Sequence, residues 1–221
     1  MKKALSKLIL IYLLGWKITG NKNLSKDKVK KAVLISAPHT HWFDLFLGLF
    51  VKGAIGFKSN FLAKEELFVF PTSLFLKYYG GIPVNRSSKN NLVQYIANLF
   101  DKKKEFRISL SPEGTRASVK KFKTGFYYIA KTAEVPIIMI TMDYKNKKSF
   151  ISAPFYPSED IKKDFEYIEG FFSGVVGKVE KNSFRVDYAI SYCEIHFERH
   201  HHFQFFPVVY QFLTFDSQKL L

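Results

Sequence analysis

The sequence predicts an α/β fold: one domain with a mixed, largely parallel sheet flanked by helices, and an amphipathic helix at its N-terminus. Three observations favour this fold. Short apolar runs typical of buried strands alternate along the chain with longer segments of helical periodicity. The 221 residues suffice for one domain with a sizeable core. The chain contains no internal repeat, and no low-complexity linker divides it.

The first apolar segment predicts an interfacial helix within residues 1–19. Its apolar part, Leu5–Trp16, would be about 18 Å long as a helix, whereas a spanning helix needs ~20 apolar residues. Two lysines before the apolar run would also suit a signal peptide, but the sequence after Leu14 is a poor small-residue cleavage site. Lysines at its edges and a tryptophan at its end favour a helix that lies in a membrane surface.

After a connector rich in lysine and asparagine at residues 20–31, strands and helices are expected to alternate. Short apolar or aromatic runs predict the strands. The expected strands are Ala32–Ser36, Lys58–Leu62, Ile82–Val84, Phe106–Leu110, Val135–Ile140 and Ser149–Ala153. Longer amphipathic or aromatic segments predict the helices, and Pro71 divides one of these into two short helices. The expected helices are Leu45–Ile55, Leu67–Tyr79, Asn91–Lys103, Phe122–Ala133 and Ile161–Val176.

The main domain is expected to span residues 20–183, followed by an atypical aromatic C-terminal tail over residues 184–221. The tail holds three Lys or Arg against four Asp or Glu, and ten of its 38 residues are aromatic. Such a shift in composition marks a segment with a different role, or one that is not native to the domain. The only cysteine, Cys193, lies there, so an internal disulfide is impossible and a reducing compartment fits.

Positive charge is concentrated near the N-terminus. Residues 1–31 hold nine lysines and one aspartate, which gives +8 of the chain's net +15. Such a cluster attracts an anionic membrane or an anionic polymer, and it also suits a solvated face without a partner. Because the lysines are not interleaved with aromatics in a stacking motif, an anionic membrane is the favoured partner and no nucleic acid is expected.

The first candidate site is Pro38-His39-Thr40-His41-Trp42-Phe43-Asp44. His39 and Asp44 would lie about 140° apart around one helix, so they meet only if His39 occupies a turn before a helix that begins near Asp44. Asp44 would then fix the tautomer of His39 and leave the other ring nitrogen free to take a proton from an alcohol. An ordinary histidine and a helix-capping aspartate are the alternative interpretation.

A metal site is a second functional interpretation of the same segment. His39, His41 and Asp44 resemble the start of a hydrolase metal site, because alternate residues of an extended chain point the same way. The next histidine is His196 and no mid-chain cluster completes a shell, so no metal is expected. If His39 and Asp44 do not transfer protons as a pair, two other functions remain. One is a metal-dependent hydrolase that uses His39, His41 and Asp44, and the other is a non-catalytic basic protein that binds lipid or nucleic acid.

Two further segments combine turn glycines with arginines. The first, Gly80–Arg86, ends in a guanidinium, whose planar fork suits a phosphate. The second, Ser109–Arg116, directly follows an expected strand, where α/β sheets place their ligands. Here Glu113 can accept hydrogen bonds from substrate hydroxyls, Gly114 allows close approach, and Arg116 can bind phosphate. Each segment alone is equally well explained as a surface turn.

In their order and spacing, these segments together resemble the glycerolphosphate and lysophosphatidic acid acyltransferase family. The four matching motifs are His39-x4-Asp44 (the HX4D motif), Gly81–Arg86, Ser111–Arg116 and Val135–Ile138. Phe122–Phe126 also resembles the family's segment after its third motif. The resemblance covers roughly residues 10–180, and His41 departs from it because many members have a small polar residue there.

The resemblance implies a role for each matched residue. His39 would be the general base, and Asp44 would orient it. Arg86 would bind the phosphate of the acceptor, and Pro136 would belong to the acyl-donor side. The other residues implied in substrate binding are Glu113, Gly114, Thr115 and Arg116.

The implied activity is the transfer of a fatty acyl group from acyl-CoA or acyl carrier protein to the hydroxyl of a lysophospholipid such as 1-acylglycerol-3-phosphate. The acyl thioester is a co-substrate, and the implied reaction requires no metal or redox cofactor. Together with the basic N-terminal segment, this activity predicts a peripheral or monotopic enzyme at the cytoplasmic face of a membrane.

Overall fold

The computed structural model describes residues 3–21, 29–84 and 92–185. These residues form a seven-stranded sheet of order β1-β7-β6-β2-β5-β3-β4, in which β6 and β7 pair antiparallel and the other neighbours pair parallel. The strands are β1 (Lys17–Gly20), β2 (Lys31–Ala37), β3 (Asn60–Lys64), β4 (Gly81–Val84), β5 (Phe106–Leu110), β6 (Ile137–Thr141) and β7 (Lys148–Ile151). The predicted α/β domain with a mixed, largely parallel sheet is confirmed. The predicted tail from residue 186 onward, with Cys193, lies outside the described residues.

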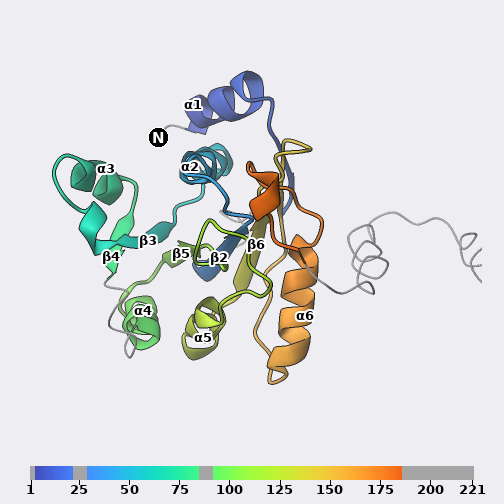
Figure 1. The fold of residues 1–221 in the computed structure, drawn as a ribbon. Helices are drawn as coiled ribbons and strands as arrows, with labels where there is room; N and C mark the ends of the chain where they lie inside the picture. Colours follow the sequence, from blue (N-terminus) through green and yellow to red (C-terminus); the bar gives the residue numbers. More distant parts are fainter. Residues whose placement is uncertain (1–2, 22–28, 85–91, 186–221) are drawn as a thin grey trace, which may run out of the picture. The chain divides into compact units, whose positions relative to one another are not determined.

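Helices cover both faces of the sheet (Figure 1). The first layer contains α1 (Lys3–Lys7), α2 (Asp44–Ile55) and α3 (Thr72–Tyr78), and the second layer contains α4 (Leu92–Lys102), α5 (Gly125–Thr132) and α6 (Ile161–Phe172). Three short helical segments complete the described elements: η1 (Leu8–Leu13), η2 (Glu65–Leu67) and η3 (Glu180–Asn182). Right-handed crossovers, the rule for parallel strands, put connections toward the β4 edge on one face and connections back from it on the other.

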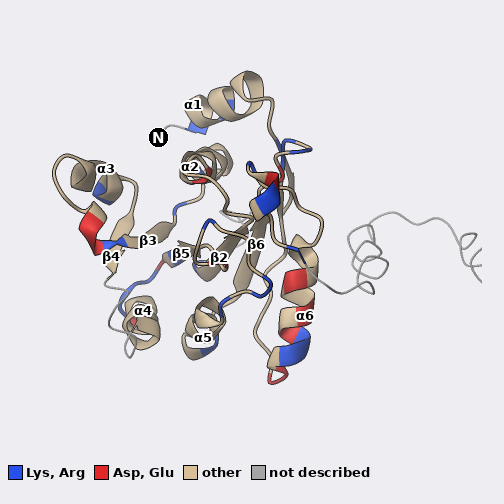
Figure 2. Ribbon diagram, viewed as in Figure 1, with Lys and Arg blue, Asp and Glu red and all other residues tan. Residues whose placement is uncertain are grey.

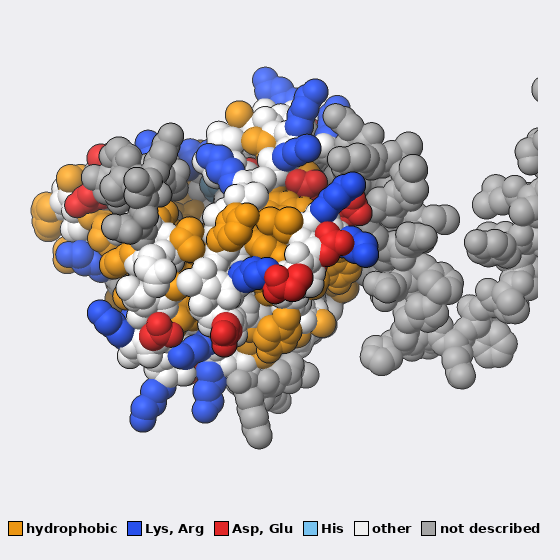
Figure 3. Space-filling view, turned by 90° about the horizontal axis from the view of Figure 1, so that it is seen from below, with side chains coloured by type: hydrophobic (Ala, Val, Ile, Leu, Met, Phe, Trp, Pro, Cys, Tyr) orange, Lys and Arg blue, Asp and Glu red, His pale blue; other side chains and the backbone are white. Residues whose placement is uncertain are grey.

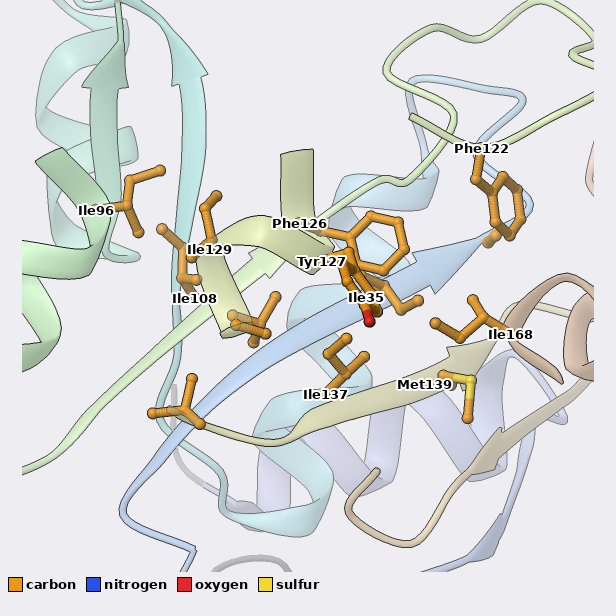
Figure 4. Close-up of a cluster of buried hydrophobic side chains, with 14 of the residues drawn as sticks. Ile35, Ile96, Ile108, Phe122, Phe126, Tyr127, Ile129, Ile137, Met139 and Ile168 are labelled. Carbon is orange, nitrogen blue, oxygen red and sulfur yellow. The ribbon is translucent and has the colours of Figure 1, made fainter. Parts of the chain in front are cut away.

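Strand β2 is buried on both sides of the sheet. Its side chains alternate, so that Val33 and Ile35 pack toward the second layer while Ala32 and Leu34 pack toward the first. Figure 4 shows Ile35 in the larger of these cores, beside the fully buried Tyr127 of α5. Burial of one large apolar side chain contributes about 1.5–3 kcal/mol. A strand covered on both faces therefore has an apolar run without polar alternation, which is the pattern in the sequence.

The N-terminal segment packs against α2. Helix α1 continues into the π-helical η1, and Leu10 and Trp16 are buried with Leu47 and Val51 of α2. The large apolar side chains that this segment exposes are Leu5, Leu8, Ile11, Tyr12 and Leu13. Among the described residues, no helix has both the length and the hydropathy that crossing a bilayer requires.

The strand ends differ from the sequence-based expectation by up to two residues, and two strands differ most. Strand β1 is not predicted, because Lys17–Gly20 has no apolar run of its own. It forms because its backbone pairs in parallel with β7 at the edge of the sheet, so the partner strand supplies what the local sequence lacks. Strand β3 runs over Asn60–Lys64 rather than Lys58–Leu62.

Two helix ends also differ. Helix α5 begins at Gly125 rather than Phe122, because Phe122 leaves the helix and stacks on Phe184 in the core, with ring centroids 4.0 Å apart. Helix α6 ends at Phe172, before the expected end. There Ser173 leaves the helical conformation with a φ of −59° and a ψ of 135°, and Gly174 follows with a positive φ of 72°, which glycine adopts without strain.

The predicted break at Pro71 is confirmed, since η2 precedes it and α3 begins directly after it. Lys52 of α2 holds the far end of α3, because its Nζ donates to the carbonyl oxygens of Ser59 at 2.8 Å and Tyr79 at 3.1 Å. Burial lowers the pKa of Lys52 to about 8. The segment from η2 through α3 exposes a second group of large apolar side chains: Leu67, Val69, Phe70, Leu74, Phe75 and Tyr78.

Candidate active site

The structure brings His39 and Asp44 together in the arrangement expected for the first motif. Strand β2 ends at Ala37, His39 lies in the turn that follows, and Asp44 is the first residue of α2. His39 Nδ1 is 3.2 Å from Asp44 Oδ2. A carboxylate in the first turn of a helix is favoured by the helix dipole. The pair therefore lies at the carboxyl end of the central strand, where α/β sheets bind ligands.

Asp44 is a hydrogen-bond acceptor for four groups. Its Oδ2 accepts from the backbone N–H groups of Thr40 and His41, each at 2.7 Å, and from His39; its Oδ1 accepts from the Tyr144 hydroxyl at 2.6 Å. Burial by itself would raise the pKa of Asp44, but these hydrogen bonds outweigh it and lower the pKa below its usual value. The aspartate is therefore ionised at neutral pH and holds the Nδ1–H tautomer of His39.

The second nitrogen of His39 is available to a substrate. The His39 side chain is 25% exposed, whereas that of Asp44 is fully buried. In the part of the chain that the structure describes, no group is hydrogen-bonded to Nε2. A neutral imidazole whose Nδ1–H is held by a carboxylate can take a proton at Nε2.

Glu113 joins the loop after β5 to the loop after β2. Its carboxylate accepts from the backbone N–H of His39 at 2.8 and 3.1 Å, and from the Ser111 hydroxyl at 3.0 Å. Burial raises the pKa of Glu113 to about 7, even though these hydrogen bonds and the nearby imidazole act against the rise. Because β2 and β5 pair in parallel, their carboxyl ends are adjacent, and Glu113 fixes the backbone at His39.

The rest of the Ser111–Arg116 loop surrounds a cationic side chain. Gly114 has a φ of +65°, and an added Cβ there would come within 2.8 Å of Lys123 Cδ and 2.9 Å of its Nζ. Lys123 therefore occupies the space that the glycine leaves open, and its backbone N–H donates to the carbonyl of Pro112 at 2.9 Å. Thr115 and Arg116 are exposed on the same loop.

Arg86 lies outside the described residues. Two other residues singled out in the sequence, Pro136 and His41, are not part of this cluster. Pro136 is buried just before β6, at the amino end of the strands and so about 15 Å, one strand length, from the His39 end. His41 is turned away from Asp44, because its Nδ1 accepts from the N–H of Phe43 at 3.1 Å and its ring lies 5.3 Å from that of Trp42. Within residues 3–21, 29–84 and 92–185, no three His, Cys, Asp or Glu side chains gather as a metal site.

Aromatic rings continue from the site toward α3. Trp42, 55% exposed, lies 5.8 Å from Phe46 of α2, Phe46 lies 6.0 Å from Phe75 of α3, and Phe75 lies 4.6 Å from Tyr79 (centroid distances). The Nζ of Lys178 lies 4.5 Å from the centroid of the Phe43 ring on the other side of the motif. The His39–Asp44 pair is therefore bordered by apolar rings, with lysine cations nearby.

Three side chains of this site were not found from the sequence: Tyr144, Lys123 and Trp42. Tyr144 is 100 residues from Asp44 in the chain, so no local pattern connects the two. Lys123 lies in Phe122–Phe126, a segment that the sequence had singled out without giving the lysine a role. Trp42 lies inside the first motif, and its exposure is a property of the folded surface.

Comparison with known proteins agrees with this geometry. The family described as Acyltransferase matches residues 16–143. Human 1-acyl-sn-glycerol-3-phosphate acyltransferase beta is 31% identical to this chain over 104 residues, which cover 42% of this chain and 37% of the human protein. The alignment thus spans little more than a third of that relative.

A solved structure has the same fold. The crystal structure of the 1-acyl-sn-glycerophosphate (LPA) acyltransferase PlsC from Thermotoga maritima superposes with a TM-score of 0.53 and 18% sequence identity. The match covers 76% of this chain and 74% of that one. At this level of identity the likeness establishes the fold and does not extend to the substrate.

Proposed function

This chain belongs to the acyltransferase family and is related to LPA acyltransferases, and from that premise we propose that it acylates the free hydroxyl of a lysophospholipid such as 1-acylglycerol-3-phosphate. The acyl donor is acyl-CoA or acyl carrier protein. The observation that carries the proposal is the His39–Asp44 pair, in which a buried carboxylate holds Nδ1 and the exposed side of the ring offers Nε2.

The proposed chemistry needs no covalent enzyme intermediate. His39 Nε2 takes the proton of the acceptor hydroxyl as the oxygen attacks the thioester carbonyl. The tetrahedral intermediate collapses to the new ester, the C–S bond breaks, and the proton held by His39 passes to the departing thiolate. Asp44 stabilises the imidazolium that exists between these two proton transfers.

The proposed acceptor site lies on the loop after β5. Arg86 and Arg116 bind the acceptor's phosphate, and Thr115 and the backbone at Gly114 contact its glycerol part. Lys123, held over Gly114, supports this assignment because it brings a cation to the loop. Glu113 can still accept a substrate hydrogen bond at Oε1, since most of its polar contacts use Oε2.

Two other parts of the proposal concern the donor and the membrane. Pro136 is assigned to the acyl-donor side through its place in the fourth motif. An anionic membrane surface is the proposed partner, bound peripherally or monotopically at the cytoplasmic face. Support comes from the basic N-terminal residues and from the exposed apolar side chains of the α1–η1 segment and of α3.

A panel assay tests the proposal. The purified full chain is given radiolabelled lysolipids with and without a phosphate, together with acyl-CoA or acyl carrier protein. We expect transfer to a phosphate-bearing lysolipid, and we expect His39→Ala to lower kcat by about 100-fold or more with an unchanged circular dichroism spectrum, because a positioned base contributes about 10²–10⁴. Near-normal turnover in His39→Ala would reject His39 as the base.

The same preparations separate this proposal from a metal-dependent hydrolase. Zinc bound in stoichiometric amount and lost together with activity in His41→Ala would favour the hydrolase. Acyl transfer that survives in His41→Ala, in protein treated with chelator, would favour the proton-transfer pair.

A further inference from the structure

Tyr144 is the single side chain that contacts Asp44 Oδ1 within the described residues. It lies in the turn between β6 and β7, and its hydroxyl donates to Oδ1 at 2.6 Å. The other three donors to the carboxylate, His39 Nδ1 and two backbone N–H groups, all meet Oδ2. The two carboxylate oxygens therefore have separate partners.

The position of Tyr144 is fixed from two sides. Its backbone N–H donates to the carbonyl of Val176 at 2.8 Å. Its ring meets the ring of Trp16 edge-on, with centroids 5.0 Å apart and planes at 78°. Trp16 is itself buried, and its Nε1 donates to Ser149 Oγ at 2.9 Å. A hydrogen-bonded, buried indole thus holds the tyrosine ring in place.

We propose that Tyr144 is a positioning residue of the proposed catalytic pair. Its hydroxyl holds the Asp44 carboxylate in the rotation that keeps Oδ2 on His39. Through its ring, the tyrosine also connects the pair to Trp16, at the end of the N-terminal helical segment. This inference rests on the proposed function of His39 as the base. The physical reason is that the terminal torsion of an aspartate is broad and nearly two-fold, so contacts at one oxygen restrict it only weakly. A second bond at Oδ1 removes that freedom.

The state of the tyrosine suits this role. Burial, together with the bond to Asp44, raises the pKa of Tyr144, so the hydroxyl remains a donor at any pH where the enzyme would work. A hydrogen bond to a charged group contributes more than one between two neutral groups. Because the bond is made to the orienting carboxylate and not to the substrate, its loss should change turnover and leave substrate binding intact.

The test is Tyr144→Phe in the full chain, which keeps the ring against Trp16 and removes the hydroxyl. We expect kcat to fall by about 10- to 100-fold, with KM for both substrates within about two-fold of the wild-type value. The matched control is Tyr127→Phe, because the Tyr127 hydroxyl also donates to a buried aspartate, Asp164, at 2.8 Å. That bond lies in the second layer, so the control should lose thermal stability and keep kcat.

A second pair of variants asks whether the tyrosine acts through Asp44. Asp44→Asn removes the carboxylate, so adding Tyr144→Phe to it should lower kcat little further. Fully multiplicative effects of the two changes would mean that Tyr144 acts independently of Asp44. Trp16→Leu, which removes the ring that the tyrosine packs on, should lower kcat less than Tyr144→Phe does.

Nitrogen NMR of labelled histidine tests the positioning role without an activity assay. If the wild-type chain shows no acyl transfer, that result counts against the proposed function alone, and the NMR experiment can still be done. Wild-type protein should show His39 as the Nδ1–H tautomer. Tyr144→Phe should show a mixture of tautomers, whereas Tyr127→Phe should match the wild type. An unchanged His39 tautomer in Tyr144→Phe, or an unchanged kcat where kcat can be measured, overturns the positioning role.

Discussion

The two helical layers expose different apolar side chains. The first layer, α1–α3 with the helical turns beside them, exposes large aliphatic and aromatic side chains. In the second layer, α4–α6 with the segment before α6, the large apolar residues that the described chain exposes are all tyrosines. Those tyrosines are Tyr95, Tyr128, Tyr156 and Tyr167. Figure 2 shows charges of both signs along α6, and Figure 3, viewed from the second-layer side, shows Lys, Arg, Asp and Glu side chains around and between apolar areas.

The difference indicates that the two faces of the sheet are covered by surfaces suited to different contacts. A tyrosine keeps its hydroxyl in water while its ring covers apolar surface, so the second layer suits an aqueous surface. Exposed leucine, isoleucine and phenylalanine cannot hydrogen-bond to water, and a group of them is typical of a surface that binds a membrane, another protein or a ligand. The first motif leads into α2 of the first layer, and Phe46 of α2 packs against Phe75 of α3, so the side proposed to meet lipid also borders the His39–Asp44 pair.

The comparison also decides which experiments are informative. Deleting residues 1–19 would remove buried Leu10 and Trp16 and most of β1, so it would damage the core together with any membrane surface. Point changes at exposed positions are sharper, because they leave the packed side of the N-terminal segment intact.

The largest effect is expected for vesicle binding. The double variant Leu13→Glu/Phe70→Glu places charges at positions that are 77% and 83% exposed in the first layer. We expect its affinity for phosphatidylcholine vesicles containing phosphatidylglycerol to fall by about 100-fold or more, since each apolar side chain contributes about 1.5–3 kcal/mol when buried. The measurement is co-sedimentation. The matched control, Tyr95→Glu/Tyr128→Glu in the second layer, should bind as the wild type does, and equal losses in both would break the comparison.

For the stability of the fold, the effect is expected in the second layer and not at the exposed apolar residues of the first. Ile168→Ala removes a fully buried side chain of α6 and should lower the free energy of unfolding by about 2–5 kcal/mol. Phe70→Ala removes a larger side chain from an exposed position, so the free energy of unfolding should change by no more than about 0.5 kcal/mol while vesicle binding weakens. Urea unfolding measures both. A comparable loss of stability in Phe70→Ala would mean that this side chain is part of the core.

The last prediction concerns the pH dependence of stability, through Glu113 in the loop after β5. Because the pKa of Glu113 is about 7 in the folded protein and 4.5 is its ordinary value, the folded state binds the proton more tightly. The contribution of Glu113 to stability should therefore fall as pH rises from 4.5 to 7, by up to about 3 kcal/mol. Glu113→Gln does not titrate, so its stability relative to the wild type should increase over this range. Parallel stability curves for the two proteins, from urea unfolding at several pH values, would contradict the raised pKa of Glu113.

Much of the fold could be predicted from the sequence because its signals are local. The apolar run at residues 32–36 predicted β2, helical patterning predicted α2 and α4, and the proline at 71 predicted the break before α3. The spacing of His39 and Asp44 allowed the pair, since a strand, a turn and a helix start within a few residues are enough to bring the two side chains together, and the resemblance to the acyltransferase family predicted it.

Tertiary structure alone decided the features that depend on residues far apart in the chain. Strand β1 exists because β7 lies beside it, Glu113 acquires its raised pKa because the loops after two neighbouring strands enclose it, and Tyr144 reaches Asp44 across 100 residues. Side-chain periodicity and turn propensity report only the nearest few residues. A contact between distant segments depends on how the whole core packs. The free energy that stabilises this packing comes from the burial of many side chains, and no local pattern in the sequence reports it.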